Sequence, residues 1–460
     1  MNKDDNKKVL DPEKERKKKK INKIISIVVP IIIIVAVLLI LTFLVFLKED
    51  EGSTGSGSFD PFAGCIPITE FNIFRGIISI GKSNTTNEYI LGNFFSVAGG
   101  SNRIVSIENS SILLYDVINK SNFGNVTWNL SQTFNNEFNN DPKPSVLGIR
   151  SLIGIGFDPK VFCFTKTSPN ISESVITVKI QNGLIYDSVN LKPFSAPYLL
   201  FGYNVTMSYL NNFIVVCSIG SLTNNLWIID IYQRTGNLVW TSVRLAFQST
   251  LKNLFAITNN TGLFLFVSDF INSSVIIYRR EAILAELKQF QEIFNPEDIP
   301  NDFGYYMVFT ETRLFGNILA ISYPKGNKGF GGVAIYVKQL ENPFFIRTQL
   351  IDTNPTNLSL KNIGKNLVFT QPCGRYLYIS AEMDNKDDND NVILVYFQSD
   401  LGTFIFKSVI INNLQKNSSF GKNFSCTSSS SPLGIISLIT GSPSFLNNKG
   451  LFSFNTTFFN

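Results

Sequence analysis

The sequence predicts an all-β fold, a seven-bladed β-propeller that follows a single N-terminal transmembrane helix. Three observations predict it. An apolar run without a charged residue occupies Ile24–Leu47. Near the C-terminus, one order of short apolar strands occurs three times, with Gly304, Gly364 and Gly421 marking a period of about 60 residues. Fainter copies of this order extend back toward the apolar run, and such a period is typical of radially repeated β folds.

The chain begins with a basic tail, residues 1–23, which includes the run Lys17–Lys20. The next 24 residues, 24–47, are predicted to form a helix of roughly 36 Å at about 1.5 Å per residue, enough to cross a hydrocarbon core of ~30 Å with modest tilt. Because Lys and Arg precede the helix and acidic residues follow it, we expect the tail to stay in the cytoplasm.

This pattern predicts a single-pass type II membrane protein, whose helix contacts membrane lipid and whose C-terminal domain is extracellular or lumenal. A cleaved signal peptide is the alternative, but it would have a shorter apolar region that ends in small residues. Here the run ends in FLKEDE, which favours an anchor.

A Gly/Ser linker, residues 48–58, joins the helix to an ectodomain over residues 59–460. Much of the formal charge of +5 comes from the tail, so the composition gives no reason to expect a nucleic-acid partner. All Asn-x-Ser/Thr acceptors lie in the ectodomain, where we expect some to carry sugar if the host glycosylates. They are Asn84, Asn109, Asn119, Asn125, Asn129, Asn170, Asn204, Asn259, Asn272, Asn357, Asn417, Asn423 and Asn455.

An apolar, aromatic-rich strand recurs seven times through the ectodomain. The copies are SILLYDV (111–117), SVITVKI (174–180), NLWIIDIY (225–232), SVIIYRR (274–280), GVAIYVK (332–338), NVILVYF (391–397) and GLFSFN (450–455). Each of the first six precedes an alternating strand with one polar and one apolar face. The last copy has no such partner before the chain ends.

The segment PITEFNIFRGIISI (67–80) precedes the first repeat and has no blade of its own. Pairing it with the last copy would close a ring and remove two exposed sheet edges. A tandem of β-sandwiches is the rival architecture, but about four strands per period fit one propeller better. The stretch 281–290 has helix-forming residues, yet its place in the repeat favours a strand.

These residues resemble the FG-GAP repeats of integrin α-subunit N-terminal propellers and of related bacterial and protist surface proteins. The run LKQFQEIFNPEDIPNDFG, followed by GNILAISYP and GGVAIYVKQLENPFF, carries the best match. The match covers three C-terminal repeats moderately and the other four faintly. Its signature positions are Phe303, Gly304, Gly364, Phe420 and Gly421. The resemblance implies a seven-bladed propeller and extracellular ligand binding or adhesion.

Calcium has weak support in this sequence. Where FG-GAP repeats carry an Asp-rich calcium loop between the first two strands, this chain has TQPCG (370–374) and SCTSSSSPLG (425–434). A different loop, MDNKDDNDN (383–391), offers carboxylates of the kind Ca²⁺ prefers, but it contains Lys386 and lacks a closing glycine. We expect a solvated turn there and no bound cofactor.

The chain has no histidine, which excludes Ser-His-Asp and Cys-His catalysis and His-ligated zinc. Acid pairs such as Asp302 with Glu311, or Glu382 with Asp384, would need a fixed separation that the sequence does not specify. On this basis the sequence predicts a protein without enzymatic activity.

The five cysteines lie on the predicted non-cytoplasmic side, where disulfides persist. Cys163 and Cys217 occupy equivalent places in adjacent repeats, which favours two buried thiols over a bridge. A Cys65–Cys426 bridge would fasten the closing strand to the last blade, with Cys373 as the competing partner.

Two functions remain open from the sequence. The leading one is an anchored propeller that binds a protein or glycan ligand through loops, such as those at 135–141, 383–391 and 425–434. The alternative is a structural membrane protein of a coat, envelope or organelle wall, which packs laterally through the propeller.

Overall fold

We describe the fold from a computed structural model of the whole chain. Two compact units divide the chain, Met1–Asp60 and Pro61–Asn460, and every described residue belongs to the second. The structure describes residues 72–79, 95–97, 103–108, 111–120, 126–135, 137, 153–155, 160–166, 174–192, 200–208, 210–221, 226–236, 238–248, 255–269, 273–282, 285–296, 302–312, 315–339, 341–370, 374–384, 391–411, 420–421, 423–427, 436–441 and 451–457.

The described strands form seven antiparallel sheets, in which chain order follows sheet order except where the chain closes on itself. The first three sheets comprise β2 (Phe95–Val97), β3 (Arg103–Glu108), β4 (Ser111–Lys120) and β5 (Val126–Phe134); β6 (Ile153–Ile155), β7 (Val161–Lys166), β8 (Val175–Asn182) and β9 (Ile185–Leu191); and β10 (Leu200–Met207), β11 (Phe213–Ser221), β12 (Leu226–Arg234) and β13 (Trp240–Gln248).

The next three sheets comprise β14 (Ala256–Thr258), β15 (Phe264–Asp269), β16 (Ser274–Arg279) and β17 (Lys288–Phe294); β18 (Met307–Thr312), β19 (Gly316–Ser322), β20 (Val333–Lys338) and β21 (Ile346–Ile351); and β22 (Leu360–Lys361), β23 (Leu367–Phe369), β24 (Tyr376–Met383), β25 (Asn391–Gln398) and β26 (Phe404–Ile410). The last contains β27 (Phe424–Thr427), β28 (Ile436–Gly441), β29 (Leu451–Thr457) and β1 (Asn72–Ser79).

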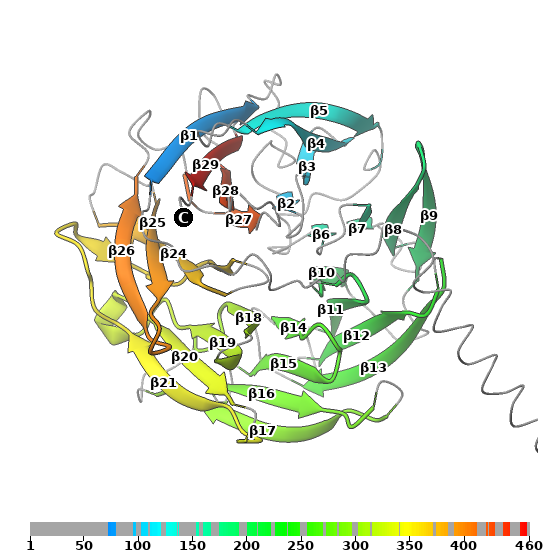
Figure 1. Ribbon diagram of the computed structural model, residues 1–460. Helices are drawn as coiled ribbons and strands as arrows, with labels where there is room; N and C mark the ends of the chain where they lie inside the picture. The colour runs from blue at the N-terminus through cyan, green and yellow to red at the C-terminus, as the bar shows by residue number, and fades with distance from the viewer. Residues whose placement is uncertain are drawn as a thin grey trace, which may run out of the picture. The chain divides into compact units, whose positions relative to one another are not determined.

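The sheets of this unit stand around a common centre. Inner strands of consecutive sheets contact one another, β2 with β6, β6 with β10, β10 with β14, β14 with β18, β18 with β23 and β23 with β27. The series returns to its start because β27 also contacts β2. Figure 1 shows this ring, with β5, β9, β13, β17, β21 and β26 on its outside. The predicted all-β propeller arrangement is therefore confirmed.

Strand β1 joins the two ends of the ring. It lies on the outside of the last sheet and pairs antiparallel with β29, with Asn72 opposite Thr457 and Ser79 opposite Leu451. The prediction that segment 67–80 supplies the missing strand is confirmed. Without this pairing, β29 would expose its backbone hydrogen-bonding groups at an open edge.

The apolar core lies between neighbouring sheets, because the strands bury both faces near the centre and only one face at the rim. Strand β20 follows the pattern BBBBBi from start to end, whereas the outer strand β9 alternates and is buried only at Leu191. Ile335 of one sheet and Leu394 of the next belong to the same cluster, and neither is exposed. Burial of this kind stabilises the ring by about 25 cal/mol for each Å² of apolar surface removed from water.

A buried hydroxyl lies on every second strand, and in five sheets a backbone N–H of the first strand, or of the loop before it, donates to this hydroxyl. In one sheet, the Gly304 N–H donates to the Ser322 carbonyl at 3.0 Å, and the Tyr306 N–H donates to Ser322 Oγ at 3.0 Å. The seven hydroxyl residues, each at most 1% exposed, are Ser106, Thr165, Ser218, Ser268, Ser322, Ser380 and Thr440.

The repeated glycines let each of these loops lie against the preceding sheet. A Cβ on Gly304 would lie 2.9 Å from Ser268 Cβ, and one on Gly364 would lie 2.8 Å from Ser322 Cβ. Both glycines have left-handed backbones, with φ of 86° and 100°. The repeat signature is therefore a contact between blades, and Phe303 beside Gly304 is fully buried next to it.

Two predicted segments, 281–290 and 24–47, differ in how much of them the structure describes. In the stretch 281–290, strand β17 begins only at Lys288, and the Ala285 N–H donates to the Ala282 carbonyl in a turn. The predicted transmembrane segment Ile24–Leu47 lies outside the described residues. Across the part of the chain that the structure describes, no helix is long and apolar enough to cross a bilayer.

Candidate functional site

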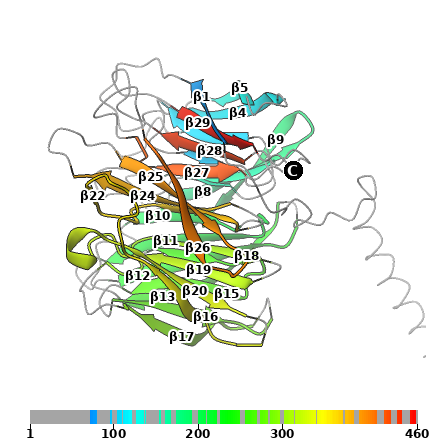
Figure 2. The same ribbon diagram turned by 60° about the vertical axis from the view of Figure 1, so that its left-hand side comes forward.

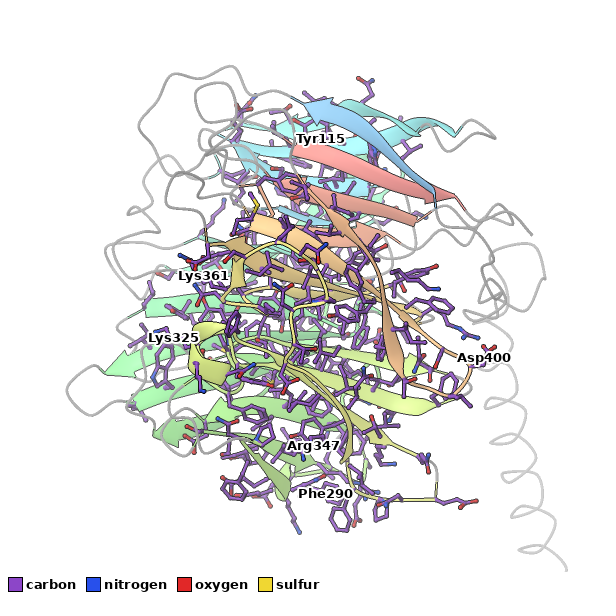
Figure 3. The ribbon with its side chains drawn as sticks, turned by 90° about the vertical axis from the view of Figure 1, so that its left-hand side faces the viewer. Tyr115, Phe290, Lys325, Arg347, Lys361 and Asp400 are labelled. Atoms are coloured by element: carbon purple, nitrogen blue, oxygen red, sulfur yellow. The ribbon has the colours of Figure 1, made fainter. Side chains whose placement is uncertain are left out.

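The ring has two ends with different connections. Second and third strands are joined at one end, which we call the loop face; its connections include 324–332 and 383–391. Third and fourth strands are joined at the other end, the hairpin face, which includes the turns 182–185 and 399–403. Figure 3 shows Lys325 and Lys361 at the first end and Asp400 at the second. In Figure 2, β22 lies at the loop face while the β8–β9 hairpin points to the other side.

The best-defined part of the loop face is the lysine loop, residues 324–332. It contains the 3-10 turn η3, Asn327–Gly329, in which Asn327, Lys328 and Gly329 all have left-handed backbones with φ of 46°, 56° and 93°. Backbone bonds fix this shape, because the Gly329 and Gly331 N–H groups both donate to the Gly326 carbonyl at 2.9 Å.

The lysine loop also docks onto the next sheet. Gly331 forms a parallel bridge with Ile363. The Ile363 N–H donates to the Phe330 carbonyl at 2.7 Å, and the Asn362 N–H donates to the Gly329 carbonyl at 3.1 Å. Loops of two blades thus form one rigid surface.

The charged side chains beside the lysine loop are paired, whereas those on the loop itself are exposed. Glu382 accepts from Asn362 Nδ2 at 2.5 Å and from the Lys365 ammonium, and Lys361 forms an ion pair with Asp384 at 3.0 Å. Lys325, Lys328 and Phe330 point into solvent, and Phe330 is 45% exposed.

A buried carboxyl supports the lysine loop from below. Asp302 is 4% exposed, and its Oδ2 accepts a hydrogen bond from the Lys325 N–H. Burial raises the pKa of Asp302 above its ordinary value, against the hydrogen bond and the charge of Lys325, which lower it. This carboxyl therefore holds the start of the lysine loop in place.

The arrangement suits recognition of a ligand with negative charge. Ammonium groups on a fixed loop attract carboxylate or sulfate groups, and an exposed aromatic ring provides a flat apolar contact for a sugar or a side chain. In the part of the chain that the structure describes, no group of three His, Cys, Asp or Glu side chains is placed to hold a metal ion.

The two acid pairs considered from the sequence have separate roles. Glu311 accepts from Asn259 Nδ2 at 3.3 Å near the turn at 259–262, whereas Asp302 lies at the other end of β18. Glu382 and Asp384 each bind their own lysine, as described above. The buried Tyr336 stays neutral, since burial raises its pKa to about 12 despite the charge of Arg347, which lowers it.

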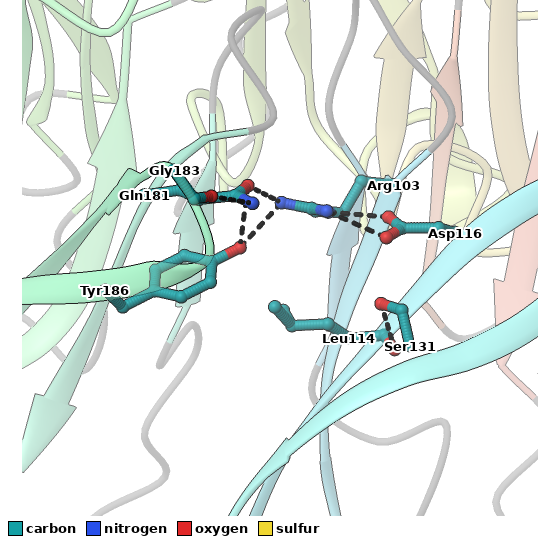
Figure 4. A network of polar contacts seen from close by, with 7 residues as sticks. All are labelled: Arg103, Leu114, Asp116, Ser131, Gln181, Gly183 and Tyr186. Atoms are coloured by element: carbon teal, nitrogen blue, oxygen red, sulfur yellow. Dashed lines mark hydrogen bonds and ion pairs between the residues drawn. The ribbon is translucent and has the colours of Figure 1, made fainter.

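A second polar network joins two blades and is structural. Arg103 forms a two-pronged bond to Asp116, at 2.6 and 2.7 Å, and donates from Nη1 to Gln181 Oε1 at 2.9 Å and to the Tyr186 hydroxyl at 2.6 Å (Figure 4). These hydrogen bonds join strands of two neighbouring sheets, so the network stabilises the contact between two blades.

The structure divides the glycosylation candidates. Asn129 and Asn357 are exposed and Asn423 is partly exposed. Asn204 and Asn259 are buried at 0% and 3%, so the folded domain has no room for sugar there, and the prediction is corrected at these two positions. Asn119 and Asn455 lie on strands, but their side chains are not described. Outside the described residues lie Asn84, Asn109, Asn125, Asn170, Asn272 and Asn417.

The cysteines follow the expectation where they are described. Cys163 and Cys217 occupy the second strands of adjacent sheets and are buried, as predicted. Cys426 is buried in β27, with its sulfur 3.1 Å from the Phe369 carbonyl oxygen. Cys65 and Cys373 lie outside the described residues, so the Cys65–Cys426 bridge stays a prediction.

The predicted binding loops fall on different faces. The segment 135–141 follows β5 and the segment 383–391 joins β24 to β25, so both belong to the loop face. The segment 425–434 joins β27 to β28 and belongs to the hairpin face. Residues 385–390, which hold most of the acidic side chains, lie outside the described residues.

Sequence comparison finds no match for this chain among family models or curated proteins. Solved structures are similar to this chain over most of its length. The WD40 domain of Toxoplasma gondii coronin has 10% identity and a TM-score of 0.46, covering 85% of this chain and 88% of that one. A putative 6-phosphogluconolactonase from Bacteroides uniformis has 11% identity and a TM-score of 0.46, covering 74% and 90%.

The periplasmic gluconolactonase of Pseudomonas aeruginosa has 12% identity and a TM-score of 0.43, covering 83% of this chain and 94% of that one. Because proteins named as lactonases are among these similar structures, the prediction that this chain has no enzymatic activity is withdrawn. At such identities the likeness concerns the fold alone, and it assigns no substrate to this chain.

The lysine loop and the buried hydroxyls were not predicted from the sequence. The hydroxyls had a readable signal, since Ser or Thr follows an apolar run in VFCFT (161–165), FLFVS (264–268), YLYIS (376–380) and SLIT (437–440). The lysine loop had a weaker one, the glycine-rich run PKGNKGFGG, which predicts a tight turn without placing it on a face.

Proposed function

We propose that this chain is a single-pass type II membrane protein whose closed seven-bladed propeller, built from FG-GAP-like repeats, binds an extracellular or lumenal ligand through its loop face. The ligand class is a protein or glycan with acidic groups. The observation that carries the proposal is the lysine loop, where hydrogen bonds from two blades fix the backbone that bears Lys325, Lys328 and Phe330.

Three further observations support parts of this proposal. The seven sheets and the return contact between β27 and β2 support a closed ring. Gly304, Gly364 and Gly421 have the same left-handed backbone in equivalent loops, which supports a true repeat. The apolar run Ile24–Leu47 and its charged flanks support the anchor and the orientation.

Glycosylation of the ectodomain is part of the same proposal. Asn129 on β5 and Asn357 after β21 are exposed acceptors, and both can carry sugar without disturbing the core. We propose these two as occupied sites if the host glycosylates.

Two measurements test the proposal. For topology, protease is added to membrane vesicles that contain the full chain, with the cytoplasmic side outward. We expect the tail 1–23 to be removed and the domain 59–460 to be protected. Digestion of the domain in sealed vesicles would contradict the proposed orientation.

For binding, the labelled ectodomain 59–460 is titrated onto candidate partner cells. We expect saturable binding that unlabelled ectodomain displaces and that rising salt weakens, because screening reduces attraction between lysines and acidic groups. Absence of binding by a folded domain would favour the alternative, a structural protein that packs laterally.

A further inference from the structure

The hairpin face carries apolar side chains where the fold does not need them. Leu184 and Leu401 sit at the tips of two hairpins and are 97% and 90% exposed. Two more hairpins expose Val239 and Phe344 at equivalent places. Turns of this kind normally hold polar residues, so four exposed apolar tips on one end of the ring mark an interaction surface.

These tips are spread around the ring, which limits the kind of partner. They belong to four different sheets, those that contain β8, β12, β20 and β25. A broad, flat apolar partner can contact all of them.

The course of the chain indicates which flat partner this is. Strand β1 runs antiparallel to β29, so its first residue, Asn72, lies opposite Thr457 at the end where third strands finish. That end is the hairpin face. The chain therefore enters the ring from this side, and only residues 48–71 separate it from the apolar run Ile24–Leu47.

The length of chain between segment 24–47 and β1 brings the hairpin face within reach of a bilayer. Even fully extended, residues 48–71 span at most roughly 80 Å, so the proposed anchor keeps the ring within that distance of the membrane surface. Tethering raises the local concentration of the tips at the membrane to the order of millimolar, at which weak apolar contacts suffice.

We propose that the hairpin face rests on the lipid bilayer, with Leu184, Val239, Phe344 and Leu401 inserted at the headgroup boundary. This inference rests on the proposed anchor. It gives the ring a fixed orientation, with the hairpin face toward the membrane and the loop face toward the ligand.

The test uses the full chain in phosphatidylcholine vesicles that contain a trace of a photoactivatable phospholipid. After illumination, mass spectrometry locates the labelled peptides. We expect label in segment 24–47 and in the hairpins of Leu184 and Leu401. Phe330 on the loop face is the internal control, because it is exposed but should stay unlabelled.

The matched variants are Leu184→Ser with Leu401→Ser, and Phe330→Ser. The double variant should lower hairpin labelling by about tenfold, since each leucine loses its apolar transfer energy, while the Phe330 variant should leave it unchanged. Both side chains are almost fully exposed, so the double variant should keep the unfolding midpoint of the parent, which verifies that it folds.

The outcomes separate this inference from the proposed function. Label in 24–47 without label in the hairpins would overturn the inference and leave the anchor intact. Lack of label in 24–47 would overturn both. Equal label in the hairpins and the Phe330 peptide would also overturn the inference.

Discussion

At the scale of single residues, Gly364 illustrates how the repeat signature works. Its φ of 100° is unfavourable for residues with a Cβ, and an added Cβ would lie 2.8 Å from Ser322 Cβ and 3.0 Å from the Gly332 carbonyl oxygen. Gly183 is the matched control, because its φ is 64° but an added Cβ meets nothing within 4 Å. The two glycines separate backbone strain from contact between blades.

We predict that Gly364→Ala costs about 1–3 kcal/mol more unfolding free energy than Gly183→Ala, because only the former creates a clash in addition to strain. Chemical denaturation of the ectodomain measures both variants. Equal losses would show that Gly364 is needed for its backbone alone.

A second residue-scale prediction concerns Glu137, which pairs with Lys166 and, at 2.9 Å, with Lys179. Burial acts to raise its pKa, but hydrogen bonds and charges of the two lysines outweigh this and lower it below 4.5. Its stabilising effect is therefore present above about pH 4.5 and is lost as pH falls through the lower folded-state pKa.

Accordingly, Glu137→Gln should lower the free energy of unfolding by about 1–3 kcal/mol at pH 7. This loss relative to the parent should shrink as the pH falls below 4.5. Glu341→Gln, at an exposed hairpin glutamate, is the control and should show no such trend. A difference that stays constant with pH would contradict the ion pairs.

At the scale of elements, buried hydroxyls hold the start of the first strand to the second strand in five of the described sheets. Ser268 Oγ accepts from the Phe255 N–H at 2.9 Å and donates to the Phe255 carbonyl at 3.1 Å. Ser268→Ala should lower the free energy of unfolding by about 1–3 kcal/mol, because it removes the hydrogen-bond partner of a buried N–H. Ser399→Ala, in an exposed hydroxyl pair with Thr403, should be nearly neutral. Similar thermal midpoints for the two variants would refute the role of Ser268.

Strand β1 provides an element-scale prediction of its own. An ectodomain that begins at residue 81 lacks β1 and leaves β29 with an open edge, so it should form aggregates and lose cooperative unfolding. The parent ectodomain 59–460 should stay monomeric on size-exclusion chromatography. A stable monomer without β1 would mean that the ring does not need this closure.

The elements also show what a sequence can predict. The third strands, such as β25, were visible because their apolar, aromatic runs repeat, and β1 was found because one blade lacked a strand. The first strand of each sheet could not be recognised in the sequence, because strands such as β2 and β6 have only three residues, too few to show a periodic pattern. The first strand of the sixth sheet is even split into β22 and β23.

The candidate site was less predictable for a physical reason. The lysine loop takes its shape from bonds to Asn362 and Ile363, which belong to another blade about 30 residues later. Sequence patterns report local periods, not contacts between loops of separate blades. For a similar reason, the sequence predicted a glycosylation site at Asn204, which is buried: a three-residue glycosylation motif does not show whether its asparagine is exposed.

At the scale of the whole molecule, the ring separates two surfaces. The loop face carries exposed Lys325 and Lys328, and the hairpin face carries exposed Leu184 and Leu401. A scaffold with exposed lysines on one end and exposed leucines on the other fits a protein that faces a partner on one side and a membrane on the other. Ligand binding by the loop face is therefore the central proposed property of the molecule.

The most direct measurement is the affinity of three ectodomains for the same partner cells, the parent, Lys325→Glu with Lys328→Glu, and Leu184→Ser with Leu401→Ser. All changed side chains are exposed, so each variant should fold like the parent. We predict at least about a tenfold loss of affinity for the charge-reversed variant, because two attractive charges become repulsive, and no change for the leucine variant. Unchanged binding by the charge-reversed variant, or loss only with the leucine variant, would contradict the assignment of the loop face as the ligand surface.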